Sequence, residues 1–302
     1  MPTLLDYRRR VRSVKNTQQI TRAMKFVAAS KLRRAQEALL AARPYAHQIR
    51  RVLHSVQARV ESAPHPLLQR RPEQKLLVLV LTGDRSLAGA FNSNVIRRAL
   101  EFLRENHEKH LEVIAVGRKG RDALRRRGWN LQGEYLDVSQ KVDFAKAKEI
   151  AELAAQIYVR GDADAVYVVY NEFKNVLVQK LQVEKLLPIE SVKSDLDESE
   201  IAAGLPEISP APGVHLVDYI YEQPPEEIFA ALAPRYLQAE IFRVLLESAT
   251  AEHAARMMAM ESATNNAADL IDKLTLEMNK IRQAGITKEL IEIVSGAASA
   301  AG

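Results

Sequence analysis

The first sixty residues of the chain carry apolar positions that recur at alternating steps of four and three. Between residue 3 and about residue 60 there is no glycine and a single proline, Pro44. This is the heptad spacing of a helix that winds about a partner helix. The seam consists of Ala28, Leu32, Ala35, Leu39, Ala42, Ala46, Ile49, Leu53, Val56 and Val60. The pattern predicts one helix of about 58 residues, about 85 Å long.

The C-terminal part of the chain repeats this pattern. After Pro234 there is no further proline, and Gly285 and Gly296 are the only glycines before the last residue. Its seam consists of Met257, Met260, Thr264, Ala267, Ile271, Leu274, Met278 and Ile281. We expect a second helix of about 60–70 residues. Two long helices with small seam residues favour an antiparallel coiled coil within the chain; the alternative is a set of shorter bundle helices.

The middle of the chain has a different period. Residues 75–82 (KLLVLVLT) and 111–116 (LEVIAV) are short continuous apolar runs, typical of strands buried on both faces. Further strands are expected at 134–138 and 165–170, and residues 176–186 should pair back on the latter as a hairpin. Helices are expected near 94–105, before Gly128 and over 144–159, so that strands and helices alternate.

These elements predict the fold class and the domain organisation. Alternating strands and helices indicate an α/β domain with a largely parallel sheet. We therefore expect a long antiparallel coiled coil of the N- and C-terminal helices, with a Rossmann-like α/β globular domain inserted between them. The expected parts are residues 1–60, 61–210 and 211–302. Residues 188–225 carry many prolines and acidic residues and are expected to be connecting segments.

Composition narrows the possible functions. The 302 residues are 47% hydrophobic and include no cysteine, which excludes disulfides and thiolate chemistry. No apolar run is long enough to cross a bilayer, and no secretory signal is expected at the N-terminus. The net charge of +5 is unevenly distributed: residues 1–60 carry 14 basic and two acidic residues, whereas 211–302 carry seven basic and 13 acidic ones. The two ends can attract each other, or the basic end can bind an anionic partner.

One loop occupies the position of a phosphate-binding loop. Residues 83–92 (GDRSLAGAFN) follow a predicted strand and precede a predicted helix. They lack the lysine of a Walker loop and the spacing of a dinucleotide fingerprint, so a structural turn in which Asp84 and Arg85 cap the loop or contact a partner is favoured over nucleotide binding. The seven histidines form no metal-binding motif, and no catalytic constellation is present. We expect no cofactor and no metal.

Nucleic acid is an alternative partner for the basic N-terminal helix. Arg8, Arg12, Lys15, Arg22 and Lys25 give that helix a basic face. However, it has few aromatic residues, and the acidic C-terminal helix supplies a counter-charge within the chain. A free-standing basic coiled-coil protein that binds nucleic acid is therefore the rival hypothesis, and an enzyme ranks third.

Specific motifs at both ends resemble a known family. Residues 13–31 (SVKNTQQITRAMKFVAASK) and 43–45 (RPY) resemble the N-terminal helix of the gamma subunit of F-type ATP synthases. Residues 254–267 (AARMMAMESATNNA) resemble its C-terminal helix, and 279–298 (NKIRQAGITKELIEIVSGAA) contain most of the family signature at 286–299. With the α/β insertion between them, the resemblance covers essentially the whole chain.

The resemblance implies a role without catalysis. The family forms the central rotor shaft of a proton-translocating F-type ATP synthase, which couples ion flow through the membrane ring to ATP synthesis or hydrolysis in the head. The implied partners are the alpha and beta subunits of the head, the epsilon subunit and the ring of c subunits. Catalytic sites would lie on the beta subunit. The implied location is the cytoplasmic face of the bacterial plasma membrane, with membrane contact only through the complex.

The resemblance also implies partner-contacting residues. By motif position, Arg256 and Gln283 match family residues that contact the beta subunit, and Met24 and Lys25 lie on the opposing helix near that contact. The ordinary alternatives are an intrahelical pair of Arg256 with Glu252 and a coiled-coil core position for Met24. Residues 217–222 (VDYIYE) resemble the foot that touches the c ring or the epsilon subunit, through Tyr219, Tyr221 and Glu222. Val217 and Gln223 depart from the family pattern there.

Overall fold

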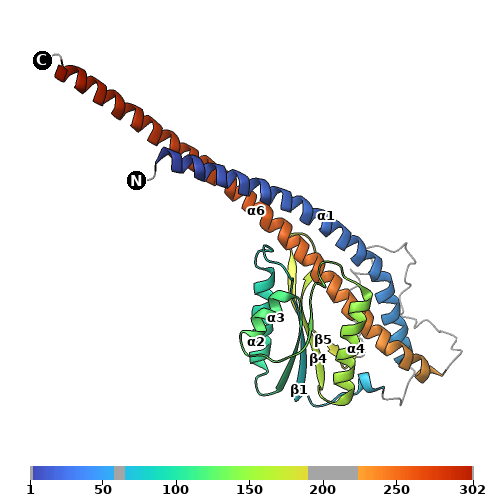
Figure 1. Cartoon of the computed structure of the whole chain (residues 1–302). Coiled ribbons are helices and arrows are strands. Elements are labelled where there is room, and N and C mark those ends of the chain that lie inside the picture. Colours follow the sequence, from blue (N-terminus) through green and yellow to red (C-terminus); the bar gives the residue numbers. More distant parts are fainter. Residues whose placement is uncertain (1–2, 58–64, 190–223, 301–302) are drawn as a thin grey trace. The chain divides into compact units, whose positions relative to one another are not determined.

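The computed structural model describes residues 3–57, 65–189 and 224–300, which divide into two compact units (Figure 1). The helical unit comprises residues 1–32, 87–89 and 253–302. The sheet unit comprises residues 33–86 and 90–252. Helix α1 (Leu4–Gln57) and helix α6 (Pro225–Ala300) each contribute to both units. The foot residues Tyr219, Tyr221 and Glu222 lie outside the described residues.

The two long helices predicted from the heptad seams are present. Helix α1 has 54 residues and contains Pro44 without ending there. Helix α6 has 76 residues, more than expected, because it begins at Pro225 and continues through Pro234. Proline is tolerated in the first turn of a helix, where its missing N–H has no intrahelical partner. At Pro234 one backbone hydrogen bond is lost, but Ala233 and Leu237 on either side are fully buried and hold the helix in place.

In the helical unit, α1 and α6 run antiparallel and pack along their predicted seams. Ala28 and Leu32 of α1, and Met260 and Ala267 of α6, are buried. The other C-terminal seam residues are at least partly buried as far as Ile281. Small residues at the contact let two helices approach closely, so this pairing confirms the interpretation of the seams as a coiled coil.

The sheet unit is built on five strands in the order β3-β2-β1-β4-β5. These are β1 (Lys75–Leu81), β2 (His110–Val116), β3 (Leu131–Tyr135), β4 (Ala165–Phe173) and β5 (Gln179–Leu187). The first four are parallel to their neighbours, and β5 pairs antiparallel with β4. The predicted α/β class, with its largely parallel sheet and terminal hairpin, is therefore confirmed.

One predicted strand was misplaced. The third strand is residues 131–135 and not 134–138. Asp137 has a φ of 56°, which is incompatible with extended backbone, so the strand ends before it. Val138 is buried in the loop that follows, which explains why the apolar pattern extended the prediction too far.

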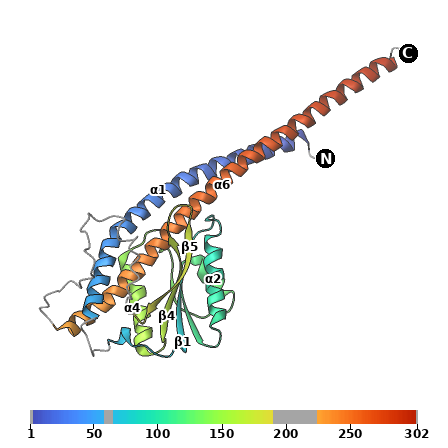
Figure 2. The same cartoon turned by 180° about the vertical axis from the view of Figure 1, so that it is seen from behind.

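Helices cover both faces of the sheet (Figures 1 and 2). Helix α2 (Phe91–Glu105) and helix α3 (Arg118–Arg125) pack on one face. Helix α4 (Phe144–Arg160) and the first part of α6 pack on the other. Alternate residues of β1 therefore serve different cores: Val78 and Val80 face α2, whereas Leu77 and Leu79 face α4 and α6.

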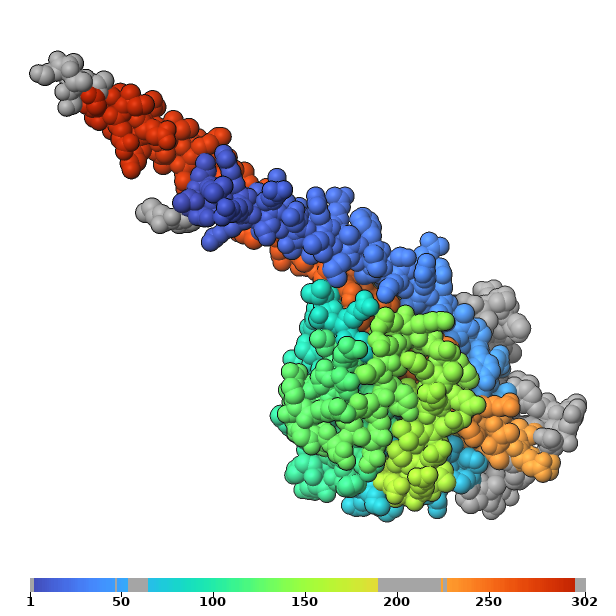
Figure 3. All heavy atoms as spheres, in the orientation of Figure 1, coloured from blue at the N-terminus to red at the C-terminus, as the bar shows by residue number. Residues whose placement is uncertain are grey.

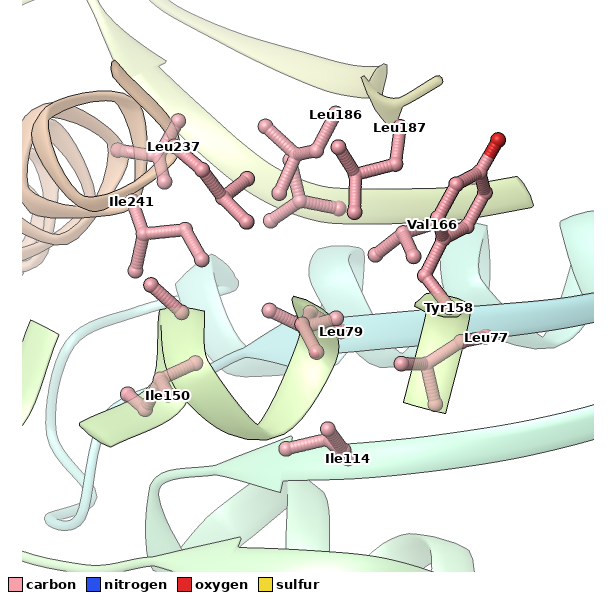
Figure 4. Close-up of a cluster of buried hydrophobic side chains, with 14 of the residues drawn as sticks. Leu77, Leu79, Ile114, Ile150, Tyr158, Val166, Leu186, Leu187, Leu237 and Ile241 are labelled. Atoms are coloured by element: carbon pink, nitrogen blue, oxygen red, sulfur yellow. The ribbon is translucent and has the colours of Figure 1, made fainter. Parts of the chain in front are cut away.

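The larger core joins α6 to the sheet. Figure 4 shows Leu237 and Ile241 of α6 beside Leu186 and Leu187 of β5, with Ile150 of α4 nearby. Leu53 of α1 belongs to the same core. This burial fixes the first part of α6 within the sheet unit. Among the described residues, no helix combines the length and the apolar content that crossing a membrane requires.

Candidate partner-binding surfaces of the paired helices

Polar contacts fix the register of the two helices in the helical unit. The Glu277 carboxylate of α6 lies near enough to the Tyr7 hydroxyl of α1 to raise its pKa. The hydroxyls of Thr21 and Thr264 are 2.8 Å apart, and Lys25 Nζ lies 2.6 Å from Glu261 Oε1. Along these three pairs, the residue number rises on α1 from 7 to 25 while it falls on α6 from 277 to 261. Such spacing is possible only for an antiparallel pair in one fixed register.

Met24 and Lys25 lie at the edge of this contact. Met24 is half-buried, as a residue that is partly seam and partly surface would be. Lys25 pairs with Glu261, and both side chains remain about a third or more exposed, at 34% and 41%. A partly exposed ion pair contributes little stability, about 0–1 kcal/mol, so Lys25 can exchange Glu261 for another acidic partner at small cost.

Two exposed apolar side chains adjoin these residues. Phe26 is 62% exposed and Val27 58% exposed, although the same turn of α1 carries the buried Ala28. Exposed large apolar groups that cluster on a surface mark interaction sites. The predicted seam begins at Ala28, so the heptad analysis did not single out these two positions as contacts. Their signal in the sequence is an apolar pair outside the seam.

Arg256 lies on α6 within the same stretch of paired helix. It is half-buried, and its charge and that of Lys31 add to burial in lowering the pKa of His253 to about 4. His253 is almost fully buried, and among the described residues its Nδ1 has no hydrogen-bond partner. The imidazole is therefore neutral near pH 7. Sequence reasoning placed His253 among histidines without a metal motif and did not foresee its burial.

Gln283 belongs to a different surface. It is separated from Arg256 by 27 positions of continuous helix, on the order of 40 Å at 1.5 Å per residue. From residue 282 to residue 296 every side chain of α6 is exposed. Figure 3 shows this end of α6, in red, continuing past the N-terminal part of α1, in blue. The structure therefore groups Met24, Lys25 and Arg256 in one stretch and places Gln283 in another.

The unpaired end of α6 carries an apolar surface that we call the tip patch. It consists of Ile286, Leu290, Ile291, Ile293 and Val294, which are 51–67% exposed. Thr287, Leu290, Ile291, Val294 and Ser295 line a shallow hollow on it. A helix that leaves such a patch uncovered over about two and a half turns is expected to be covered by a partner.

The loop of residues 83–92 has the geometry of a structural turn. The Gly83 N–H donates to Asn92 Oδ1 at 2.8 Å, and Asn92 Nδ2 donates to the Arg85 carbonyl at 3.2 Å. The buried carboxylate of Asp84 accepts from the Arg118 N–H at 3.0 Å, at the N-terminus of α3. A carboxylate thus fills the place where a helix N-terminus would hold a phosphate.

Helix α6 closes the same edge of the sheet. A Cβ added to Gly83 would lie 2.6 Å from the Glu252 carboxyl carbon, so that carboxylate is packed against the end of β1. Parallel sheets bind ligands where neighbouring strands diverge to opposite sides, which here is between β1 and β4. Two carboxylates there repel an anionic ligand, which favours the structural interpretation of the loop. Within the described ranges, no three His, Asp or Glu side chains are grouped to hold a metal.

Comparison with known proteins gives consistent matches along the chain. A family model described as ATP synthase matches residues 3–300. The ATP synthase gamma chain of Solibacter usitatus is 50% identical over 304 aligned positions, covering 99% of this chain and 100% of the relative. That of Pelotomaculum thermopropionicum is 46% identical, with 99% of each chain covered. That of Chlorobium phaeobacteroides is 47% identical, with 98% of each covered.

Solved structures match as well. A chain from the central stalk and c ring of the Tetrahymena thermophila mitochondrial ATP synthase is 26% identical, with a TM-score of 0.58. The match covers 81% of this chain and 99% of that one. A chain of the Euglena gracilis mitochondrial ATP synthase is 21% identical, with a TM-score of 0.66 over 98% and 94% of the two chains, and supports the fold.

Proposed function

The chain belongs to the ATP synthase gamma chain family, and we propose that it acts as the central rotor shaft of an F-type ATP synthase. It is a non-catalytic subunit: ion flow through a membrane ring turns it, and its rotation drives ATP synthesis in the head. In reverse, ATP hydrolysis turns it and pumps ions. The three-part division into residues 1–60, 61–210 and 211–302 is part of this proposal.

The antiparallel pairing of α1 and α6 is the observation that carries the mechanism. A shaft must resist twisting and bending, which requires continuous backbone hydrogen bonds and a partner helix in fixed register. The contacts at Thr21–Thr264 and Lys25–Glu261 supply that register. The tip patch has few polar groups that could form directional contacts, so it can turn inside an apolar bearing without being held at one angle.

The proposed partners follow from the family and from the exposed surfaces. We assign Met24, Lys25 and Arg256, with the neighbouring Phe26 and Val27, to contacts with the beta subunit. Gln283 and the tip patch would contact the alpha and beta subunits further along. Tyr219, Tyr221 and Glu222 would contact the c ring or the epsilon subunit. Different contact energies at different angles are what couple rotation to the states of the catalytic sites.

Location follows from the complex. Gamma chains are parts of a membrane-associated assembly, and this chain would be attached to the membrane only through its partners. The bacterial relatives support the cytoplasmic face of a plasma membrane. The rival hypothesis, a free-standing protein that binds nucleic acid, lacks support because the family match spans residues 3–300.

The test is reconstitution. The purified chain should assemble with alpha and beta subunits, and vesicles carrying the completed enzyme should pump ions during ATP hydrolysis. Enzyme completed without the chain should not pump. The proposal would be refuted if the chain did not co-purify with the alpha and beta subunits and if its addition left their ATP hydrolysis unchanged.

The assignment of Gln283 can be tested with a matched control. Gln283→Ala and Asn266→Ala each remove an exposed amide from α6. We expect the Gln283 variant to lose coupled pumping while the Asn266 variant keeps it, since only the former is proposed to touch the head. Equal behaviour of the two variants would remove Gln283 from the interface.

A further inference from the structure

A buried ionic network in the sheet unit is centred on Arg243 of α6. Its Nη2 donates to both carboxylate oxygens of Glu184 on β5, at 2.8 and 2.9 Å. Its Nε donates to Glu240 at 2.7 Å. Its Nη1 donates to Glu247 at 3.1 Å and to the Tyr170 hydroxyl at 3.3 Å. Every N–H of this guanidinium group therefore has an acceptor.

The network spans three parts of the fold. Glu184 and Tyr170 belong to the β4–β5 hairpin, and the Tyr170 hydroxyl also donates to Glu184 at 2.8 Å. Glu240 and Arg243 belong to α6. Arg50 of α1 donates to the second oxygen of Glu240 at 2.6 Å. Charge-assisted hydrogen bonds thus run from the sheet through α6 to α1 without interruption.

The α6 part of the network is shielded from water, whereas Glu184 on β5 is 36% exposed and Arg50 on α1 is 29% exposed. The side chains of Glu240, Glu247 and Arg243 are 3%, 10% and 18% exposed. Burial alone would raise the pKa of Glu240, but the charges of Arg243 and Arg50 hold it below its usual value. Burial raises the pKa of Glu247 despite the nearby Arg243. Among the described residues, Glu247 Oε2 and Arg50 Nε have no hydrogen-bond partner, so the arrangement is not optimised for stability alone.

Apolar packing and ionic bonds resist different displacements. The core between α6 and the sheet, which includes Leu237, Ile241 and Leu187, resists separation but is non-directional. A planar guanidinium group whose N–H groups are bound in fixed directions by three carboxylates and a hydroxyl has a narrow range of permitted angles. At the buried bonds to Glu240 and Glu247, water cannot readily replace a bond that a sideways shift has broken. Such a group therefore resists sliding and turning of the helix against the sheet.

We propose that Arg243 is a positioning residue for torque, because its network fixes the angle of α6 and α1 against the β4–β5 hairpin in the sheet unit. This inference rests on the proposed rotor function. When the enzyme works against a load, the sheet and the two helices are turned in opposite senses. The network keeps α1 and α6 from sliding or turning against the β4–β5 hairpin. Torque applied to the sheet is therefore transmitted to the helices without loss through slippage at this contact.

The decisive variant removes the directional ionic hydrogen bonds of Arg243 but is expected to preserve the stability of the fold. In Arg243→Met/Glu184→Gln/Glu247→Gln the buried charges are neutralised together, and Glu240 keeps Arg50. Removing both signs of charge together, and not one partner alone, leaves no uncompensated buried charge, so we expect stability to change little. The complete enzyme carrying this chain should therefore assemble, and its hydrolysis without a membrane gradient should match wild type.

The readout is work under load. At equal ATP hydrolysis, vesicles with the triple variant should build an ion gradient roughly threefold smaller than wild type. Without directional bonds, α6 and α1 would slide against the β4–β5 hairpin under load. A gradient equal to wild type would overturn the proposal and leave the network a structural feature. The matched control, Arg33→Met/Glu37→Gln, removes an exposed ion pair of α1 and should leave the gradient unchanged.

A second variant tests the proposal in case the triple variant does not fold. Arg243→Lys keeps the charge but has three N–H donors in place of five, so it cannot bind Glu184, Glu240, Glu247 and Tyr170 together. It should reduce the gradient while assembly persists, whereas a normal gradient would overturn the proposal. Wild-type enzyme is measured first: absence of pumping there refutes the rotor function itself, which separates the two hypotheses.

Discussion

Individual residues in this chain are governed by burial as much as by residue type. His253 and Lys25 are both polar residues on the paired helices of the helical unit. His253 is enclosed and has its pKa lowered to about 4 by burial and by two nearby cations, whereas Lys25 keeps a partly exposed acidic partner. His253 therefore affects the stability of the fold, whereas Lys25 is available to a partner protein.

His253 predicts a pH dependence of stability. An unfolded histidine binds a proton near pH 6.5, whereas the folded one does so only near pH 4. The contribution of neutral His253 to the free energy of unfolding should therefore be complete above about pH 6.5. The free energy of unfolding should fall by up to about 3 kcal/mol as the pH drops to 4. Denaturant unfolding at several pH values measures this slope.

His253→Gln should lose this part of the slope, because glutamine does not titrate. His107→Gln is the control, since that side chain is exposed. Equal slopes for wild type and the His253 variant would show that the imidazole does not control acid stability.

At the scale of elements, the paired helices depend on the size of their seam residues. Ala28 is buried against α6, whereas Ala23, five positions earlier, is exposed. Ala28→Leu should overpack the contact and destabilise the protein by about 1–3 kcal/mol, while Ala23→Leu should change stability by less than about 0.5 kcal/mol. Thermal unfolding of the two variants tests this. A similar effect at both positions would contradict the assigned seam.

The exposed end of α6 contains a glycine that nothing in the described structure requires. Gly285 lies within the helix, and an added Cβ would meet no atom within 4 Å. Gly285→Ala should therefore raise the helix content of this end and stabilise it by about 0.5–1 kcal/mol. Circular dichroism and hydrogen exchange measure the change. Unchanged exchange at the neighbouring amides would show that this end is already fully ordered.

At the scale of the whole molecule, the contacts that stabilise the fold and those proposed for function occupy different parts of the chain. The cores include residues of α1, the sheet and α6 up to Leu245, and the seam ends at Ile281. The tip patch contributes to neither.

Removing residues 284–302 should therefore leave folding intact but weaken function. We expect an unchanged unfolding temperature, normal co-purification with the head and a reduced gradient in vesicles, because the bearing surface is gone while the seam remains. Comparison of thermal unfolding with pumping tests this. A truncated chain that cannot fold would show that the tip is part of the structural core.

The sequence alone determined the elements and most of their order. Heptad spacing in α1 and α6 and continuous apolar runs in β1 and β2 report local backbone geometry, which depends on nearby residues. The third strand was misplaced because the positive φ of Asp137 is a property of a single turn and leaves no periodic signal. The predicted partner residues Met24, Lys25, Arg256 and Gln283 came from motif resemblance, since a single exposed contact residue leaves no periodic signal.

Only the tertiary structure decided which polar groups are buried and which residues they meet. Glu240, Arg243 and Glu247 are spaced three and four positions apart, as residues on one helical face are, but a charged face is usually exposed to water. Their partners Glu184 and Arg50 lie 59 and 190 positions away from Arg243 and Glu240. Contacts over such separations arise when the chain packs, and local sequence cannot encode them.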